Sequence, residues 1–233
     1  MAHKELNSTR VIDRTATFHS IMYVWCFSVL FATASGCIHT KWNPLSNDKH
    51  LAVLILARGG SKAIPLKNLA KVGDKSLLSR SLQVILEVAA FDSVWVSTDN
   101  FAIYEEAIKN DVNVHWRSAK SATDEAPSIL AVQEFLIDHP YIDAVALVQC
   151  TSPFLKGTYL QQAAMLLSGS DCVFSVTRSH NLRWKTIEGE LVPLNFDPKR
   201  RPRRQDFGEF VENGMFYFST RRLIEKGYLQ NLR

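Results

Sequence analysis

Three cations surround a short glycine turn in the stretch LILARGGSKAIPLKN. Arg58 precedes Gly59 and Gly60, and Lys62 and Lys67 follow them. Glycine lets backbone N–H groups approach an anion, and three cations neutralise several negative charges. The spacing matches neither a Walker A loop nor G-x-G-x-x-G. The turn is therefore interpreted as a phosphate-binding loop, with an ordinary basic surface loop as the alternative.

A second cluster of cations lies in the sequence DPKRRPRRQDF, where five of the six residues from Lys199 to Arg204 are basic. Such a run suits an anionic substrate, because guanidinium groups bind carboxylate or phosphate at two points. A solvated basic loop, a nuclear localisation signal and a nucleic-acid-binding patch are the other interpretations. No aromatic platform accompanies these cations, so we expect no nucleic-acid partner.

The apolar run Leu51–Leu56 directly before the glycine turn is typical of a strand buried on both faces of a parallel sheet. Two further apolar runs also end in polar residues, as SVWVSTD and DAVALVQCTSP. Because ligands of open α/β sheets bind at the carboxyl ends of strands, we expect these polar residues to form one cleft.

Strands and helices alternate along the rest of the chain. In residues 75–90, Leu78, Leu82, Ile85, Leu86 and Ala89 form one apolar helical face. Further helices are predicted in 101–111, 126–139 and 158–169, and further strands in 93–97, 112–117, 143–153, 171–178 and 213–220. This alternation predicts an α/β fold, a three-layer α/β/α sandwich with a mostly parallel sheet.

The first fifty residues differ in composition. The charge-free run Ile21–Ala34 follows Lys4, Arg10 and Arg14, an order typical of a secretory signal. We expect a signal peptide or signal anchor in residues 1–40 and a linker in 41–50. A membrane anchor would use residues 21–38, about 18 residues and marginal for a bilayer; a helix of the globular domain is the alternative. This predicts the secretory pathway, with the Golgi favoured over the nucleus.

Bulk composition narrows the class of protein. The chain has 233 residues, a formal net charge of +4 and four cysteines. This length suits one globular domain with an extension, and the mild positive charge suits an anionic small molecule or nucleic acid equally. The cysteine spacing matches neither a zinc site nor a disulfide scaffold.

The glycine-turn stretch closely resembles the signature of the CMP-sialic acid synthetases (N-acylneuraminate cytidylyltransferases). The resemblance continues in order through SVWVSTD, QCTSP, DCVFSVTR, KRRPRRQDF and ENGMFYF, and covers most of 51–230. It implies a Rossmann-like nucleotidyltransferase fold in 51–233. It also implies a reaction that joins CTP and a sialic acid to give CMP-sialic acid and pyrophosphate, a Mg²⁺ cofactor and a homodimer.

The same resemblance implies the roles of individual residues. The implied catalytic residues are Arg201 and Lys67. The implied nucleotide-binding residues are Arg58, Lys62, Asn68, Arg117 and Ser128. The implied substrate-binding residues are Gln149, Arg203 and Tyr217. Asp99, which ends VSTD, is a weaker candidate as a Mg²⁺ ligand, since it equally suits a ribose contact or a strand-exit turn.

The chain departs from the family pattern in three places. The stretch DEAPS (124–128) lacks serines and threonines that the family often has there, so we expect fewer contacts with the nucleotide. Cys150 replaces a small residue or proline, and is expected to be a small buried residue. An Asp-x-Asp metal-binding pair is absent after GYLQ, so the domain is expected to be truncated at its C-terminus. The alternatives are therefore an inactive nucleotide-binding isoform or subunit, and a cytidylyltransferase for another acidic sugar such as Kdo.

Overall fold

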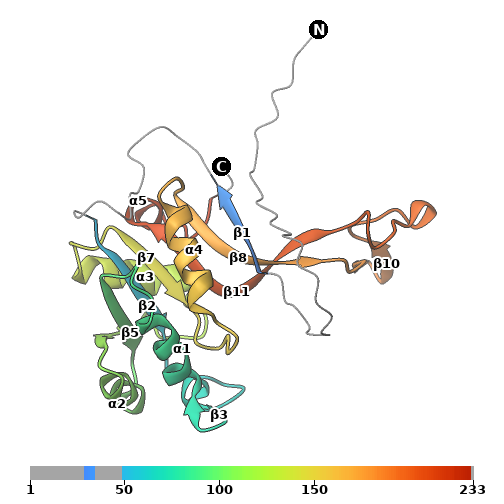
Figure 1. Cartoon of the computed structure of the whole chain (residues 1–233). Helices are drawn as coiled ribbons and strands as arrows, with labels where there is room; N and C mark the ends of the chain where they lie inside the picture. Colours follow the sequence, from blue (N-terminus) through green and yellow to red (C-terminus); the bar gives the residue numbers. More distant parts are fainter. Residues whose placement is uncertain (1–28, 35–48, 232–233) are drawn as a thin grey trace.

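The computed structural model describes residues 29–34 and 49–231 of the chain (Figure 1). Its centre is a seven-stranded sheet. The strands, in order across the sheet, are β1 (Val29–Ala34), β8 (Cys172–Ser179), β11 (Glu209–Thr220), β7 (Ala144–Val148), β2 (Leu51–Leu56), β5 (Ser93–Thr98) and β6 (Asn113–Trp116).

Most strands of this sheet run in one direction. β2 pairs in parallel with both β5 and β7, and β5 pairs in parallel with β6. β11 is antiparallel to β7 and to β8, so β8 also runs with the main group. The order reverses between β2 and β7, because the chain moves outward through β5 and β6 before it returns to β7 on the other side of β2.

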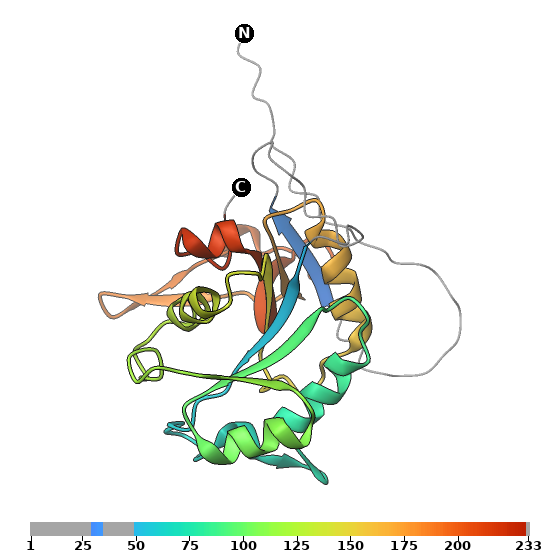
Figure 2. The same cartoon turned by 90° about the vertical axis from the view of Figure 1, so that its left-hand side faces the viewer.

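Helices cover both faces of the sheet (Figure 2). α1 (Leu77–Leu86), α2 (Phe101–Lys109) and α4 (Gly157–Leu167) share one apolar core with the sheet, and α3 (Ser128–Asp138) and α5 (Arg221–Glu225) share the second. In β2, Val53 and Ile55 belong to the first core and Ala52 and Leu54 to the second. The strand is therefore buried on both faces, and the predicted three-layer α/β/α fold is confirmed.

Local sequence explains where the helices near the pocket begin. The hydroxyl of Ser76 accepts a hydrogen bond from the backbone N–H of Ser79 and caps α1, and the side chain of Asn100 accepts from Ala102 and Ile103 and caps α2. Before α1 come the short 3₁₀ helix η1 (Lys67–Leu69) and the small hairpin of β3 (Lys71–Val72) and β4 (Lys75–Ser76).

A long arm leaves the body of the molecule where β8 and β11 extend beyond the sheet (Figure 1). We define the arm as residues 178–210; it contains β9 (Trp184–Ile187), β10 (Glu190–Pro193) and the 3₁₀ helix η2 (Pro198–Arg200). The sequence interpretation missed this hairpin and placed the start of the last strand at residue 213, four residues after the start of β11.

A β-bulge interrupts β11 where the arm joins the body. The register with β8 shifts between Glu212 and Tyr217, and Gly214 in the bulge has a φ of 70°. The hydroxyl of Ser175 on β8 donates to the Asn213 side chain at 2.6 Å and accepts from the Met215 backbone at 3.2 Å. These contacts hold the bulge in place, and a β-bulge of this kind bends the strand that contains it.

The apolar segment near the N-terminus contributes one strand to the sheet. β1 lies at the edge and pairs antiparallel with β8, with Val29 opposite Thr177 and Ala34 opposite Cys172. The rest of the predicted signal or anchor segment, and most of the linker, lie outside the described residues, so that prediction stays a prediction. None of the described helices combines the length and apolar character needed to cross a membrane.

Candidate functional site

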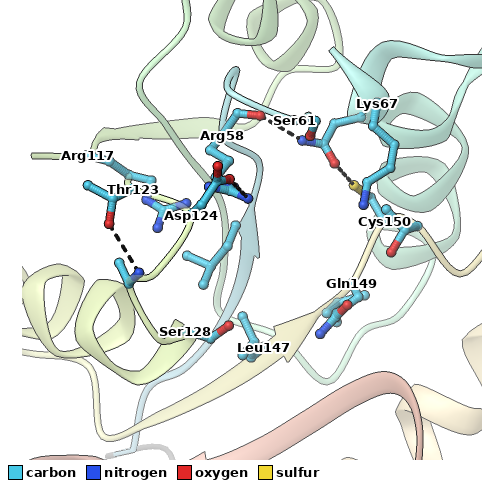
Figure 3. A pocket seen from close by; sticks show the side chains of 15 residues that line it. Arg58, Ser61, Lys67, Arg117, Thr123, Asp124, Ser128, Leu147, Gln149 and Cys150 are labelled. Carbon is cyan, nitrogen blue, oxygen red and sulfur yellow. Dashed lines mark hydrogen bonds and ion pairs between the residues drawn. The ribbon is translucent and has the colours of Figure 1, made fainter. Parts of the chain in front are cut away.

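A pocket of about 300 Å³ opens at the carboxyl ends of β2 and β7, where the strand order reverses (Figure 3). This is the position at which open α/β sheets bind their ligands. The pocket is lined by Leu56, Arg58, Ser61, Lys67, Asn68, Arg117, Thr123, Asp124, Ala126, Ser128, Leu147, Val148, Gln149, Cys150 and Thr151. The predicted convergence of the ends of β2 and β7 into one cleft is therefore confirmed.

The glycine turn after β2 is held against the neighbouring strand. The carboxylate of Asp99, at the end of β5, accepts a hydrogen bond from the backbone N–H of Gly59 at 2.8 Å. A Cβ atom on Gly59 would lie 2.8 Å from the Cβ of Asn100, so no larger residue fits there without movement. Gly59 thus allows a close approach of two loops, and its N–H group is engaged by the protein itself.

Two of the predicted phosphate-binding cations share one carboxylate. Asp124 lies 2.5 Å from the Arg58 guanidinium through Oδ1 and 2.6 Å from the Lys62 ammonium through Oδ2. These cations hold the pKa of Asp124 below its usual value, with Lys62 contributing most. The Lys62 side chain is 79% exposed and lies at the rim, whereas Arg58 lines the pocket.

Asn68 and Cys150 connect the glycine turn to β7, and Figure 3 shows Cys150 at the pocket wall. Asn68 is buried, donates from Nδ2 to the backbone carbonyl of Arg58 at 3.1 Å, and accepts at Oδ1 from the thiol of Cys150 at 3.2 Å. Burial raises the pKa of Cys150 to about 12, so the thiol keeps its proton at neutral pH. The expectation that Cys150 is a small buried residue is confirmed, and its thiol also orients Asn68.

Lys67 lies on the same side of the pocket as Cys150. It begins η1 and lines the pocket, and its ammonium group has no ion-pair partner among the described residues. A cation that is not neutralised by a neighbouring carboxylate is available for a ligand phosphate.

Arg117 and Ser128 form the opposite wall. The backbone N–H of Arg117, directly after β6, donates to Thr98 at 2.9 Å, and its guanidinium donates to the carbonyl of Ser121. Burial lowers the pKa of Arg117, while the charges of Asp99 and Glu134 oppose this shift. Within the described chain, its Nε is buried without a hydrogen-bond partner.

Ser128 is the first residue of α3, so the amino end of that helix faces the pocket. Unpaired N–H groups and the helix dipole at this end favour an anion. The stretch DEAPS (124–128) lacks serines and threonines that the family often has there, but Asp124 from this stretch and Thr123 directly before it line the pocket. The sequence analysis did not select Asp124. Its ion pairs join residues more than sixty positions apart, and no local sequence pattern indicates such contacts.

Gln149 is the one predicted sugar-binding residue in the described pocket. It follows β7 directly, and its backbone N–H donates to the carbonyl of Met215 at 3.0 Å. Its neutral amide side chain can donate to and accept from the hydroxyl and amide groups of a sugar.

Five of the predicted site residues do not line this pocket: Lys62, Asp99, Arg201, Arg203 and Tyr217. Arg201 and Arg203 are exposed and follow η2 on the arm, which points away from the body (Figure 1). The hydroxyl of Tyr217 donates to Glu212 at 3.1 Å, and burial, with the Glu212 charge, raises the pKa of Tyr217 to about 12. One copy of the chain therefore brings together the predicted nucleotide-binding residues except Lys62, which lies at the rim, and does not bring the predicted catalytic arginine to them.

The described residues contain no group of three His, Cys, Asp or Glu side chains that could hold a metal. Mg²⁺ in nucleotide sites commonly uses only one or two carboxylates together with substrate phosphates. Asp99 keeps one carboxylate oxygen beyond its bond to Gly59, and Asp124 lies at the pocket itself. The pocket therefore suits a metal that arrives with a nucleotide better than a metal held by the protein alone.

Comparison with known proteins points to one family. The profile of the family described as "Cytidylyltransferase" matches residues 52–231. The chain is 42% identical over 189 residues to N-acylneuraminate cytidylyltransferase A of Danio rerio, covering 78% of this chain and 44% of that protein. It is 43% identical over 186 residues to the N-acylneuraminate cytidylyltransferase of Oncorhynchus mykiss, covering 77% and 43%. The chain thus spans less than half the length of these relatives.

Solved structures share the fold at low sequence identity. A CMP:2-keto-3-deoxy-manno-octonic acid synthetase complexed with CTP superposes with a TM-score of 0.58 and 16% identity, covering 77% of each chain. The 4-diphosphocytidyl-2C-methyl-D-erythritol synthase of Anaerococcus prevotii superposes with a TM-score of 0.58 and 17% identity, covering 82% of this chain and 80% of the other. At these identities the likeness establishes the nucleotidyltransferase fold alone.

Proposed function

Because the chain belongs to the cytidylyltransferase family, we propose that it transfers CMP from CTP to a sialic acid, with release of pyrophosphate. The observation that carries this proposal is the pocket at the reversal point of the sheet. There Arg58, Lys67 and Arg117 line one cavity beside the amino end of α3. Few ligands other than a nucleotide polyphosphate match so many fixed positive groups around so small a volume.

The residues of the pocket suggest how the reaction is assisted. The anomeric hydroxyl of the sugar attacks the α-phosphorus of CTP, and negative charge develops on the pyrophosphate that leaves. Preorganised cations stabilise such charge, so Arg58, Lys62 and Lys67 are assigned to the phosphates. Asn68, Arg117 and Ser128 are assigned to the nucleotide and Gln149 to the sugar. Mg²⁺, which Asp99 could help to hold together with the phosphates of CTP, would neutralise phosphate oxygens when bound.

We propose that the active unit is a homodimer. The arm exposes apolar side chains on a hairpin without a core of its own: Trp184, Ile187, Leu191, Val192 and Leu194. Exposed apolar groups of this kind commonly mark a protein interface. The same arm carries Arg201 and Arg203, which one copy keeps away from its own pocket. A second copy would receive these arginines for the carboxylate of the sialic acid, and would place Tyr217 near the shared interface.

We further propose that the chain enters the secretory pathway through residues 1–40 and acts in the Golgi. The charge-free run after Lys4, Arg10 and Arg14 supports this proposal. Its test is the position of a C-terminal fluorescent tag in cells. Nuclear signal that Lys199–Arg204 substitutions abolish would contradict it.

The central proposal is tested by pyrophosphate release from the purified full-length chain with CTP and Mg²⁺. N-acetylneuraminic acid is supplied as the sugar, and Kdo and no sugar are the controls. Release that requires N-acetylneuraminic acid is the expected result. Release with Kdo alone would assign the chain to another acidic sugar. Binding of CTP without any release would identify an inactive nucleotide-binding chain.

A further inference from the structure

An internal carboxylate occupies the phosphate-binding cations of the pocket. Each oxygen of Asp124 contacts a different cation, Arg58 at 2.5 Å and Lys62 at 2.6 Å (Figure 3 shows the Arg58 pair). Two oxygens on one anionic group are also what a phosphate presents to a pair of cations. The Asp124 side chain therefore makes, within the protein, the contacts that a nucleotide phosphate would make.

The loop that carries Asp124 is held by hydrogen bonds that do not involve the Asp124 side chain. Ser118 donates from its backbone N–H and its hydroxyl to the two carboxylate oxygens of Glu134 on α3, at 2.6 and 2.7 Å. Around Asp124, the hydroxyl of Thr123 accepts a hydrogen bond from the backbone N–H of Ala126 at 3.1 Å. The hydrogen bonds thus fix the start and the turn of the loop, whereas the Asp124 side chain is held by the ion pairs.

We propose that Asp124 is a specificity-determining residue that closes the empty pocket and yields only to ligands with two or more phosphate groups. This inference rests on the proposed function. A polyphosphate supplies separate anionic groups to Arg58 and Lys62 and replaces both ion pairs. A monophosphate replaces at most one of these two ion pairs. Asp124 then stays paired with the other cation and continues to compete with the monophosphate for the first. Asp124 would therefore favour CTP over the product-like CMP.

The test compares equilibrium binding, by titration calorimetry, of CTP, CMP and inorganic tripolyphosphate to the full-length chain and two variants. Asp124→Asn removes the charge and keeps the shape. Glu125→Gln is the matched control, because Glu125 is exposed, neighbours Asp124 and has no ion-pair partner in the part of the chain that the structure describes. Both variants change the net charge equally, so a general electrostatic effect would appear in both.

For Asp124→Asn we expect CMP to bind about three- to tenfold more tightly, the range for removing surface ion pairs that CMP cannot replace. CTP and tripolyphosphate should change by less than about twofold, as should every ligand on Glu125→Gln. An unchanged or larger ratio of CTP to CMP affinity in a folded Asp124→Asn, or equal tightening of CMP in both variants, would overturn the inference and leave the proposed function intact. Asp124→Ala provides a second folded variant if Asp124→Asn is unstable. A wild-type chain that binds neither CTP nor tripolyphosphate would instead overturn the proposed function.

Discussion

Asn68 shows how one buried amide holds two parts of the pocket together. Its Nδ2 contacts the carbonyl of Arg58 on the glycine turn, and its Oδ1 contacts the thiol of Cys150 after β7. The orientation of this amide is therefore fixed by a donor that must keep its proton. Since burial raises the pKa of Cys150 to about 12, the thiol is such a donor throughout the neutral range.

Replacing Cys150 by Ala should raise the KM for CTP about three- to tenfold, the usual effect of losing one hydrogen bond. Cys150→Ser keeps a donor and should stay within about twofold of wild type. The measurement is the KM for CTP and kcat in the pyrophosphate-release assay. Equal KM values for the two variants would show that the thiol fills space without orienting Asn68.

His139 predicts how stability depends on pH. Its ring packs on Trp95 with centroids 4.2 Å apart, and its Nε2 is buried without a partner among the described residues. Burial, and then the charge of His115, lower its pKa, while Asp138 opposes the shift. His139 therefore binds a proton more readily in the unfolded state than in the folded state. The contribution of His139 to stability is present above its unfolded pKa of about 6.5 and is lost as the pH falls below that value.

We therefore expect the free energy of unfolding to fall as pH decreases from about 7.5 to 5.5. His139→Phe keeps an aromatic ring and removes the titrating group, so its stability should fall less over the same interval. Urea denaturation at both pH values measures this. Identical pH dependence in wild type and variant would assign the effect to other groups.

At the scale of secondary-structure elements, the pattern of apolar residues in the sequence predicted the strand and the helix that are buried in the core. Leu51–Leu56 is apolar without interruption. Of the five residues predicted to form the apolar face of the helix in 75–90, Leu78, Leu82 and Ile85 are fully buried, whereas Leu86 and Ala89, at and beyond the end of α1, are exposed. β9 is exposed along its whole length, so no burial pattern in its sequence could reveal it.

The candidate site was predictable only in part. Cations beside a glycine turn indicate a phosphate-binding loop, and Arg58 and Lys67 line the pocket as the sequence interpretation requires. The Asp124 ion pairs join loops from separate parts of the chain, and the distance of Arg201 from the pocket depends on the direction of the arm. Both depend on tertiary structure, which local sequence patterns do not contain.

Gly59 and Gly60 provide a matched test of the glycine turn. A Cβ on Gly59 would meet Asn100 at 2.8 Å, whereas a Cβ on Gly60 has no neighbour within 4 Å. Gly59→Ala should lower stability by about 1–3 kcal/mol through overpacking and weaken CTP binding, and Gly60→Ala should leave both nearly unchanged. Thermal unfolding and CTP titration check this. Equal effects of the two substitutions would show that backbone flexibility, and not close packing, requires these glycines.

At the scale of the molecule, the pocket and the arm are separate in one chain, so the proposed dimer predicts that two defective copies complement each other. Chains with Arg58→Ala and chains with Arg201→Ala should each be nearly inactive. After mixing under conditions that exchange subunits, half of the dimers carry both variants and one intact site each, which gives roughly a quarter of wild-type activity.

The measurement is pyrophosphate release after mixing, with sedimentation to verify the dimer. Mixtures that stay inactive while dimers form would show that Arg201 does not act across subunits. The Trp184→Ser variant is the companion test, because weakening the arm surface should shift the chain toward monomers and abolish complementation.

The bulge of β11 lies between the arm and the residues of β11 that pair with β7 beside the pocket. Met215, inside the bulge, accepts the backbone hydrogen bond of Gln149, and Gly214 beside it has the φ of 70° at which the strand bends. One backbone hydrogen bond therefore joins the base of the arm to the residue proposed to hold the sugar. In the proposed dimer, an arm that docks on the second subunit would stay tied by this bond to Gln149 of its own pocket.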